Sequence, residues 1–183
     1  MIFEEKKIIL KDGREAILKS PEVGEGEQYL EYIKKACGET EFLLAYPEEW
    51  EGISLESEER WIESGRSSPN IMRISCYIDG KVAGNSEISF HTRIKSKHRA
   101  SIGISILEEY WGLGIGSAMF EGLISTAKGH EGTEIVELQF IEGNKRARAL
   151  YEKFGFRIVS VLPNAFKLKS GATVSEFYMQ KKL

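Results

Sequence analysis

A glycine-rich segment at residues 110–117, with the sequence Tyr-Trp-Gly-Leu-Gly-Ile-Gly-Ser, constrains the fold of this chain more than any other stretch. An alternating apolar run precedes the segment and an amphipathic run follows it, which predicts a strand, a tight turn and the start of a helix. Glycines let a backbone come close to a ligand, and the first N–H groups of a helix carry a partial positive charge. The segment therefore predicts a site for a ligand that carries phosphate.

Three other interpretations of this turn were weighed. A P-loop needs Gly-Lys-Ser/Thr after its glycines, and Gly116-Ser117-Ala118 excludes it. A dinucleotide fingerprint needs G-x-G-x-x-G and an acidic residue about 20 positions further on. Glu137 falls near that distance, but it lies in mid-strand and the glycine spacing here is G-x-G-x-G, which argues against the fingerprint. A glycine turn without any ligand is the third alternative.

Periodicity and turn signals predict the element order ββ-α-α-βββ-α-β-α-ββ for the whole chain. The predicted strands cover residues 7–10, 16–19, 71–78, 81–90, 100–107, 134–140, 156–168 and 173–183. The predicted helices cover residues 22–36, a stretch that starts at Ser54 and buries Leu55, Trp61 and Ile62, residues 114–128, and a stretch from Asn144 to Gly155. A crossover through residues 114–128 would make strands 100–107 and 134–140 parallel neighbours. We expect one α+β domain over residues 1–183, with its motifs between about 71 and 168.

Charge is unevenly distributed, although the net charge is only −3. Residues 21–63 contain thirteen glutamates and only three cations, Lys34, Lys35 and Arg60. This acidic block argues against nucleic acid at that face and fits a cationic partner. The alternative is a set of solvated helix faces with pairs such as Glu31 and Lys35.

Nothing at the N-terminus has the pattern of a signal peptide, and no run approaches the ~20 apolar residues of a membrane helix. Cys37 and Cys76 have no CxxC spacing, so free, buried thiols are expected. The three histidines show no metal-ligand spacing, and no metal is expected. These features predict a cytoplasmic protein without a membrane or nucleic-acid partner.

Two motifs together resemble the GNAT superfamily of acyl-CoA-dependent N-acetyltransferases. Residues 102–107 and the glycine turn are similar to the family's acetyl-CoA motif, R/Q-x-x-G-x-G/A. Residues 144–156, Asn-Lys-Arg-Ala-Arg-Ala-Leu-Tyr-Glu-Lys-Phe-Gly-Phe, are similar to its N-x-x-A-x-x-L-Y-E-x-x-G-F segment. The resemblance covers roughly residues 14–183 and implies a central, mostly antiparallel mixed sheet with one parallel, splayed strand pair. One departure is Trp111, which stands where the family has Arg or Gln.

The resemblance implies that acetyl-CoA is the co-substrate and that specific residues bind it. The expected cofactor-binding residues are Ile104, Ser105, Ile106, Gly112, Leu113, Gly114, Ile115, Gly116, Ser117 and Asn144. Backbone groups of residues 104–106 would hold the pantetheine arm, and amides of residues 112–117 would hold the pyrophosphate. Asn144 would bond the pantetheine or orient the crossover. Tyr151 would be the general acid for the departing thiolate, although it could also be only a core aromatic.

The base and the acceptor are less defined by the sequence. An amine must be neutral to attack a thioester, and a lysine-like amine has a pKa of ~10.4. Some relatives carry a Glu where this chain has Gln139, which cannot act as a base. Glu137 or Glu87 is the candidate base, and a water chain without a dedicated carboxylate is the alternative. The acidic block predicts a cationic small amine or a basic peptide terminus as acceptor. A homodimer is common in the family, and a non-catalytic acyl-CoA-binding or regulatory module is the contrasting function.

Overall fold

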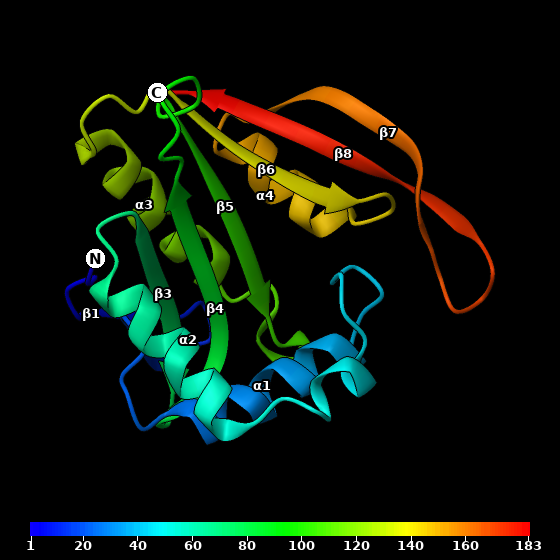
Figure 1. Cartoon of the computed structure of the whole chain (residues 1–183). Coiled ribbons are helices and arrows are strands. Elements are labelled where there is room, and N and C mark those ends of the chain that lie inside the picture. The colour runs from blue at the N-terminus through cyan, green and yellow to red at the C-terminus, as the bar shows by residue number, and fades with distance from the viewer.

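The computed structural model describes all residues from 1 to 183 and contains one eight-stranded sheet with the order β1-β2-β3-β4-β5-β6-β8-β7. The strands are β1 Lys6–Ile9, β2 Glu15–Lys19, β3 Ile71–Ile78, β4 Lys81–Phe90, β5 Arg99–Ile106, β6 Ile135–Ile141, β7 Arg157–Lys167 and β8 Thr173–Lys182. Each neighbouring pair is antiparallel except β5 and β6. The α+β fold and the element order predicted from the sequence are confirmed (Figure 1).

Four α-helices cover the two faces of this sheet (Figure 1). Helices α1 Gly26–Gly38 and α2 Leu55–Ser67 lie on one face, and α3 Ile115–Gly129 and α4 Lys145–Lys153 lie on the other. Two short 3-10 turns, η1 Pro47–Trp50 and η2 Glu108–Tyr110, connect them. The larger core lies between the sheet and α3, where Met119, Phe120 and Leu123 are fully buried. The predicted apolar stripe of this helix is therefore its core face.

The first two helices differ from the sequence prediction in detail. Helix α1 begins at Gly26 rather than near residue 22, because Gly24 has a φ of +99°, outside the helical region. The carboxylate of Glu59 from α2 accepts the N–H groups of Gly24 and Gly26 at 2.7 and 2.8 Å and so fixes this start. In α2, Ser54 caps the helix as predicted and Ile62 is buried, but the predicted burial of Leu55 is wrong, since 49% of Leu55 is exposed. Both cysteines are free and buried, as expected.

The parallel pair β5 and β6 is paired only at its beginning. The register joins Arg99, Ala100 and Ser101 to Ile135, Val136 and Glu137 and ends there. Beyond this point β5 continues beside β4, whereas β6 continues beside β8. The sheet therefore opens into a splay with β5 as one edge and β6 as the other (Figure 1).

Candidate active site

Beyond its pairing with β6, the edge of β5 directs backbone groups towards the splay, and one of them, the Ile106 carbonyl, accepts the Trp111 indole N–H. The Arg99 carbonyl accepts the N–H of His91, the residue after β4, and the Leu107 N–H donates to the Ala83 carbonyl in β4. Because neighbouring residues of a strand direct their N–H and C=O groups to opposite sides, the odd-numbered residues of β5 face β4 and the even-numbered ones face the splay. Ile104 and Ile106 are thus the predicted cofactor residues whose main chain faces the gap. Ser105 faces the other way, and its hydroxyl and carbonyl both contact the hydroxyl of Tyr32.

The glycine turn lies at the open end of the splay and leads into α3. Gly112 and Gly114 have φ angles of +79° and +99°, which side-chain-bearing residues rarely adopt. Gly116 serves packing instead, because a Cβ there would lie 3.1 Å from Leu150 and 3.4 Å from Ile106. The carbonyl of Leu113 accepts the Lys11 N–H at 3.1 Å, so the β1–β2 turn holds the segment in place.

The first turn of α3 has free backbone N–H groups that can bind an anion. The first intrahelical bond runs from Ala118 to Gly114, so the N–H groups of Ile115, Gly116 and Ser117 have no partner within the helix. No side chain caps them and no acidic residue lies in the first turn. Uncapped N–H groups with the positive end of the helix dipole form a ready anion site. The splay and this turn together fit a ligand with an extended arm and a phosphate group.

Helix α4 forms the other wall of the site and carries two predicted residues. Asn144 caps α4, because its Oδ1 accepts the Ala147 N–H at 3.1 Å. Tyr151 is 6% exposed and lies among aromatic rings, with the ring centres of Phe120 and Phe140 at 5.5 and 5.8 Å. Burial raises the pKa of Tyr151 to about 12. Its hydroxyl makes no hydrogen bond within the protein and, unlike the indole nitrogen of Trp50, is not sealed from solvent.

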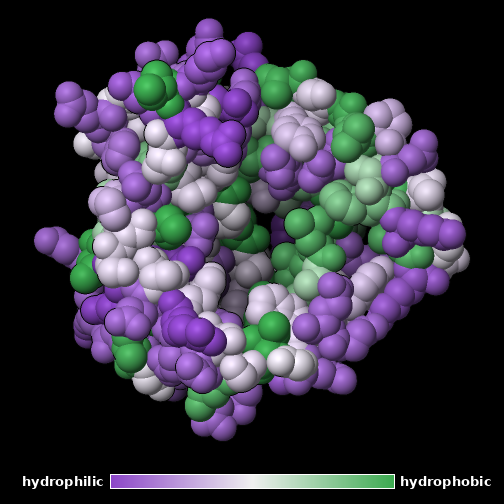
Figure 2. All heavy atoms as spheres, viewed as in Figure 1, coloured by the Kyte–Doolittle hydropathy of each residue, from purple (hydrophilic) through white to green (hydrophobic).

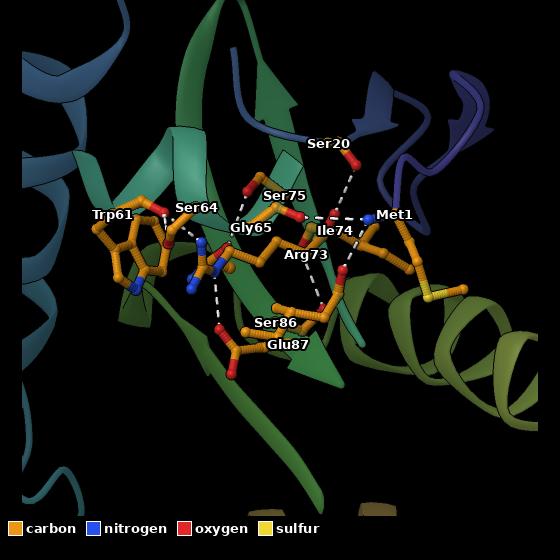
Figure 3. A network of polar contacts seen from close by, with 12 residues as sticks. Met1, Ser20, Trp61, Ser64, Gly65, Arg73, Ile74, Ser75, Ser86 and Glu87 are labelled. Carbon is orange, nitrogen blue, oxygen red and sulfur yellow. Dashed lines mark hydrogen bonds and ion pairs between the residues drawn. The ribbon is translucent and has the colours of Figure 1, made fainter. Parts of the chain in front are cut away.

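Glu87 lies on the face of the sheet that α1 and α2 cover, opposite to the face on which α3 and α4 lie. Its Oε2 accepts the Nε of Arg73 at 2.7 Å, and its Oε1 has no partner (Figure 3). Arg73 is 5% exposed, stacks 3.8 Å from the ring centre of Trp61 and donates to the Trp61 carbonyl. The register places Glu87 beside Gly103 of β5, where a side chain would meet nothing within 4 Å. The free oxygen of Glu87 therefore borders an open part of the sheet at the splay.

Glu137 lies deeper, where β5 and β6 are still paired, and both of its oxygens are occupied. Oε2 accepts Arg99 Nε at 2.8 Å and Gln180 Nε2 at 3.2 Å, whereas Oε1 lies 3.5 Å from Ser101 Oγ and 3.7 Å from His91 Nε2. The side chain of Glu137 is 10% exposed, compared with 33% for that of Glu87. This cluster joins β5, β6 and β8, with His91 just after β4, below the point where β5 and β6 diverge. The two candidate bases thus occupy different environments.

A pocket of about 570 Å³ lies beside the open end of the splay, between the α1–η1 segment and the β7–β8 turn. Its charged lining consists of Glu39, Glu41, Glu48, Glu108 and Lys169. Lys169 forms an ion pair with Glu48 and lies 4.1 Å from the ring centre of Tyr46, so the β7–β8 turn contacts η1. Phe42 reaches the β6–α4 turn, where a Cβ on Gly143 would be 3.5 Å from its ring. Figure 2, drawn from the same side as Figure 1, shows a hollow near the middle of the molecule.

Several residues of the site were not predicted from the sequence. Arg73 is the clearest, and its signal was present: Arg73, Ser75 and Tyr77 alternate with apolar residues in β3 and mark a polar face. Tyr32 and His91 gave no such pattern, because their contacts with β5 arise only in the folded chain. No group of three His, Cys, Asp or Glu side chains could hold a metal ion. No helix is both long and apolar enough to cross a membrane.

Comparison with known proteins connects this geometry to a family. The model of the acetyltransferase (GNAT) family matches residues 38–156. The L-amino acid N-acetyltransferase AaaT of Escherichia coli (strain K12) is 27% identical over 125 residues, which cover 68% of this chain and 76% of that protein. A GNAT-family acetyltransferase structure from Streptococcus pneumoniae superposes with a TM-score of 0.85 at 23% identity, covering 92% of this chain and 99% of the other. The yncA structure from Salmonella typhimurium, which contains its cofactor acetyl-CoA, has a TM-score of 0.76 at 15% identity, with coverage of 91% and 92%.

Proposed function

Because this chain belongs to the acetyltransferase (GNAT) family and is an acetyl-CoA-dependent N-acetyltransferase, we propose that it acetylates a cationic small amine or a basic peptide terminus, with Tyr151 as general acid. The observation that carries the proposal is the juxtaposition of the β5 edge, the uncapped start of α3 and the buried Tyr151 around one splay. The two backbone features fit the arm and the phosphates of acetyl-CoA, which supplies an activated acyl thioester. The non-catalytic module considered as an alternative has no structural feature in its favour.

Tyr151 has the properties that a proton donor at this position needs. With a pKa raised to about 12 by burial, it stays protonated at neutral pH. An ordinary thiol, with a pKa of about 8.5, would be too weak a base to take its proton. Apolar surroundings disfavour a thiolate and raise the pKa of its thiol. A departing thiolate beside the buried ring of Tyr151 is therefore a stronger base than one in water.

We propose Glu87 as the group that receives the proton of the attacking amine. Its Oε1 is free, while Arg73 holds Oε2 and so fixes the direction of the carboxylate. Glu137 fits this role less well, because Arg99, Gln180 and Ser101 already surround both of its oxygens. Gln139, level with the splay on β6, is exposed and can orient a substrate or water but not accept a proton at neutral pH.

The pocket beside the splay supports a cationic acceptor. Four of its charged side chains are glutamates, and the lysine among them is already paired with Glu48. The side chain of Glu41 forms neither a hydrogen bond nor an ion pair within the protein, so its carboxylate can bind a cationic substrate. The Escherichia coli relative is named as an L-amino acid N-acetyltransferase, which makes amino acids the second candidate class. An amino acid would need a cation for its carboxylate, and this pocket favours the first class.

A panel of amines tests the acceptor class. Thiol release from acetyl-CoA is measured with polyamines, basic peptides and neutral L-amino acids at low and high salt. We expect the highest kcat/KM for the cationic amines and a KM that rises with salt, because exposed charge pairs are screened. Preference for neutral amino acids with a salt-independent KM would contradict the cationic acceptor and support the second class.

Replacement of Gly103 by Leu tests the position of the acceptor. The position is exposed and unstrained, and a Cβ meets nothing within 4 Å, so the variant should fold and gain about 0.5 kcal/mol of strand stability. We expect the KM of the amine to rise at least about 10-fold, since the added side chain removes space for a group of similar volume, whereas acetyl-CoA affinity is unchanged. Gly103→Ala is the matched control with a smaller effect. An unchanged amine KM in Gly103→Leu would place the acceptor elsewhere.

A further inference from the structure

Trp111 stands directly before the glycine turn, at the position where the similar family motif has Arg or Gln. Its indole Nε1 donates to the carbonyl of Ile106 at 2.7 Å, one of the groups on the splay edge of β5. The indole is thereby fixed across the open end of the splay, directly before the glycine turn. It offers a flat aromatic face there but no charge.

Arg146 from the first turn of α4 lies on that face. Its guanidinium carbon is 4.2 Å from the centre of the Trp111 ring. The side chain is exposed, and no carboxylate lies within ion-pair distance of it. Stacking on an aromatic ring orients a guanidinium while leaving its N–H donors free. Arg146 is therefore a positioned cation without an anion.

The surroundings add to this positive charge instead of balancing it. The first turn of α4 contains Lys145, Arg146 and Arg148 and no acidic residue, although cations are unfavourable at a helix N-terminus. Arg148 is accounted for by its ion pair with Glu152 at 2.8 Å. Lys153, at the other end of α4, reaches Ser117 in the first turn of α3 with an Nζ–Oγ distance of 2.8 Å. Such a local conflict is expected where a ligand supplies the missing negative charge.

We propose that Arg146, held by Trp111, binds a phosphate of acetyl-CoA and supplies from α4 the charge that the glycine motif lacks at position 111. The guanidinium can donate two parallel hydrogen bonds to phosphate oxygens, and Lys153 adds a second cation at the start of α3. The phosphate is either in the pyrophosphate or in the 3′-phosphate of the coenzyme. The inference rests on acetyl-CoA as the donor, and binding can test it without turnover.

The experiment measures the Kd of acetyl-CoA and acetyl-dephospho-CoA by calorimetry for the wild type, Arg146→Gln and Arg148→Gln. We expect Arg146→Gln to weaken acetyl-CoA binding about 10-fold, the size of one charge-assisted contact, and Arg148→Gln to weaken it less than about 3-fold. If the 3′-phosphate is the partner, the effect of Arg146→Gln disappears with acetyl-dephospho-CoA; if the pyrophosphate is the partner, the effect persists. Equal effects of the two arginine variants would overturn the proposal.

Two further comparisons separate binding from folding and from catalysis. Trp111→Ala, which removes the stacking surface and the hydrogen bond to the Ile106 carbonyl, should weaken acetyl-CoA binding at least as much as Arg146→Gln does, whereas Arg146→Gln should melt close to the wild type. S-acetylpantetheine lacks every phosphate, so its kcat/KM should be the same for the wild type and Arg146→Gln. A loss of kcat/KM with this substrate equal to that with acetyl-CoA would contradict phosphate binding. Tight binding of acetyl-CoA without any acetyl transfer would refute the proposed function but leave the role of Arg146 intact.

Discussion

Replacement of Tyr151 by Phe is expected to lower kcat about 100-fold, at the lower end of what general acid catalysis contributes. The change removes one hydroxyl and leaves the ring among Phe120, Phe140 and Phe156. Because that hydroxyl has no partner in the protein, its loss breaks no internal hydrogen bond, and the melting temperature should hardly change. The Kd of acetyl-CoA should stay within about 2-fold of the wild type, since a change in kcat alone marks an interaction made in the transition state.

Single-turnover measurements at saturating acetyl-CoA provide the readout for this variant. Tyr151, with a pKa of about 12, stays protonated throughout the neutral range. The single-turnover rate of Tyr151→Phe should therefore be lower than that of the wild type by the same factor at every neutral pH. Phe120→Leu serves as a control for altered packing around the ring. A Tyr151→Phe enzyme with wild-type kcat would remove the hydroxyl from the mechanism and leave Tyr151 as a core aromatic.

Glu87→Gln is the second substitution with a large expected effect, a loss of roughly 100-fold in kcat/KM at neutral pH. The amide keeps the size of the side chain and can still accept from Arg73 Nε, but it cannot take a proton. The neutral fraction of the amine rises tenfold per pH unit below its pKa of ~10.4. The deficit of the variant should therefore shrink as the pH is raised.

Glu137→Gln is the matched comparison for the base. Arg99 would lose its carboxylate partner, just as the more buried Arg73 does in Glu87→Gln, so both variants should lose stability, but Glu137→Gln should keep most of its kcat. The measurement is kcat/KM against pH for both variants beside their melting temperatures. A Glu137→Gln variant that loses activity more than Glu87→Gln does at equal stability would move the base to Glu137. Wild-type pH profiles in both would indicate a water chain without a dedicated carboxylate.

The sequence was most informative where local chemistry decides the structure. Asp79-Gly80 form the β3–β4 turn with positive φ at both residues, and Ser54 and Asn144 cap their helices through side-chain oxygens. These signals involve residues a few positions apart, so they can be recognised without the fold. The glycine turn belongs to the same class, because its strand, turn and helix are consecutive.

Features that depend on distant residues could not be predicted. The start of α1 is fixed by Glu59, more than thirty residues away, so periodicity alone placed it too early. The parallel neighbours β5 and β6 were predicted, but the point where they part is set by the separate pairing of each strand with β4 and β8. Glu87 and Glu137 were equivalent in the sequence as carboxylates on strands. Only the contacts with Arg73 and Arg99 distinguish a carboxylate with a free oxygen from one that is fully surrounded.

Residue-resolved amide hydrogen exchange with and without acetyl-CoA tests the location of the donor site most directly. The predicted result is slower exchange at Ile104 and Ile106, whose N–H groups face the splay, and at residues 115–117 at the start of α3. Gly103 and Ser105 should change little, because their main chains already face β4. Protection that misses Ile104 and Ile106, or that appears equally at Gly103 and Ser105, would contradict binding of acetyl-CoA along the edge of β5.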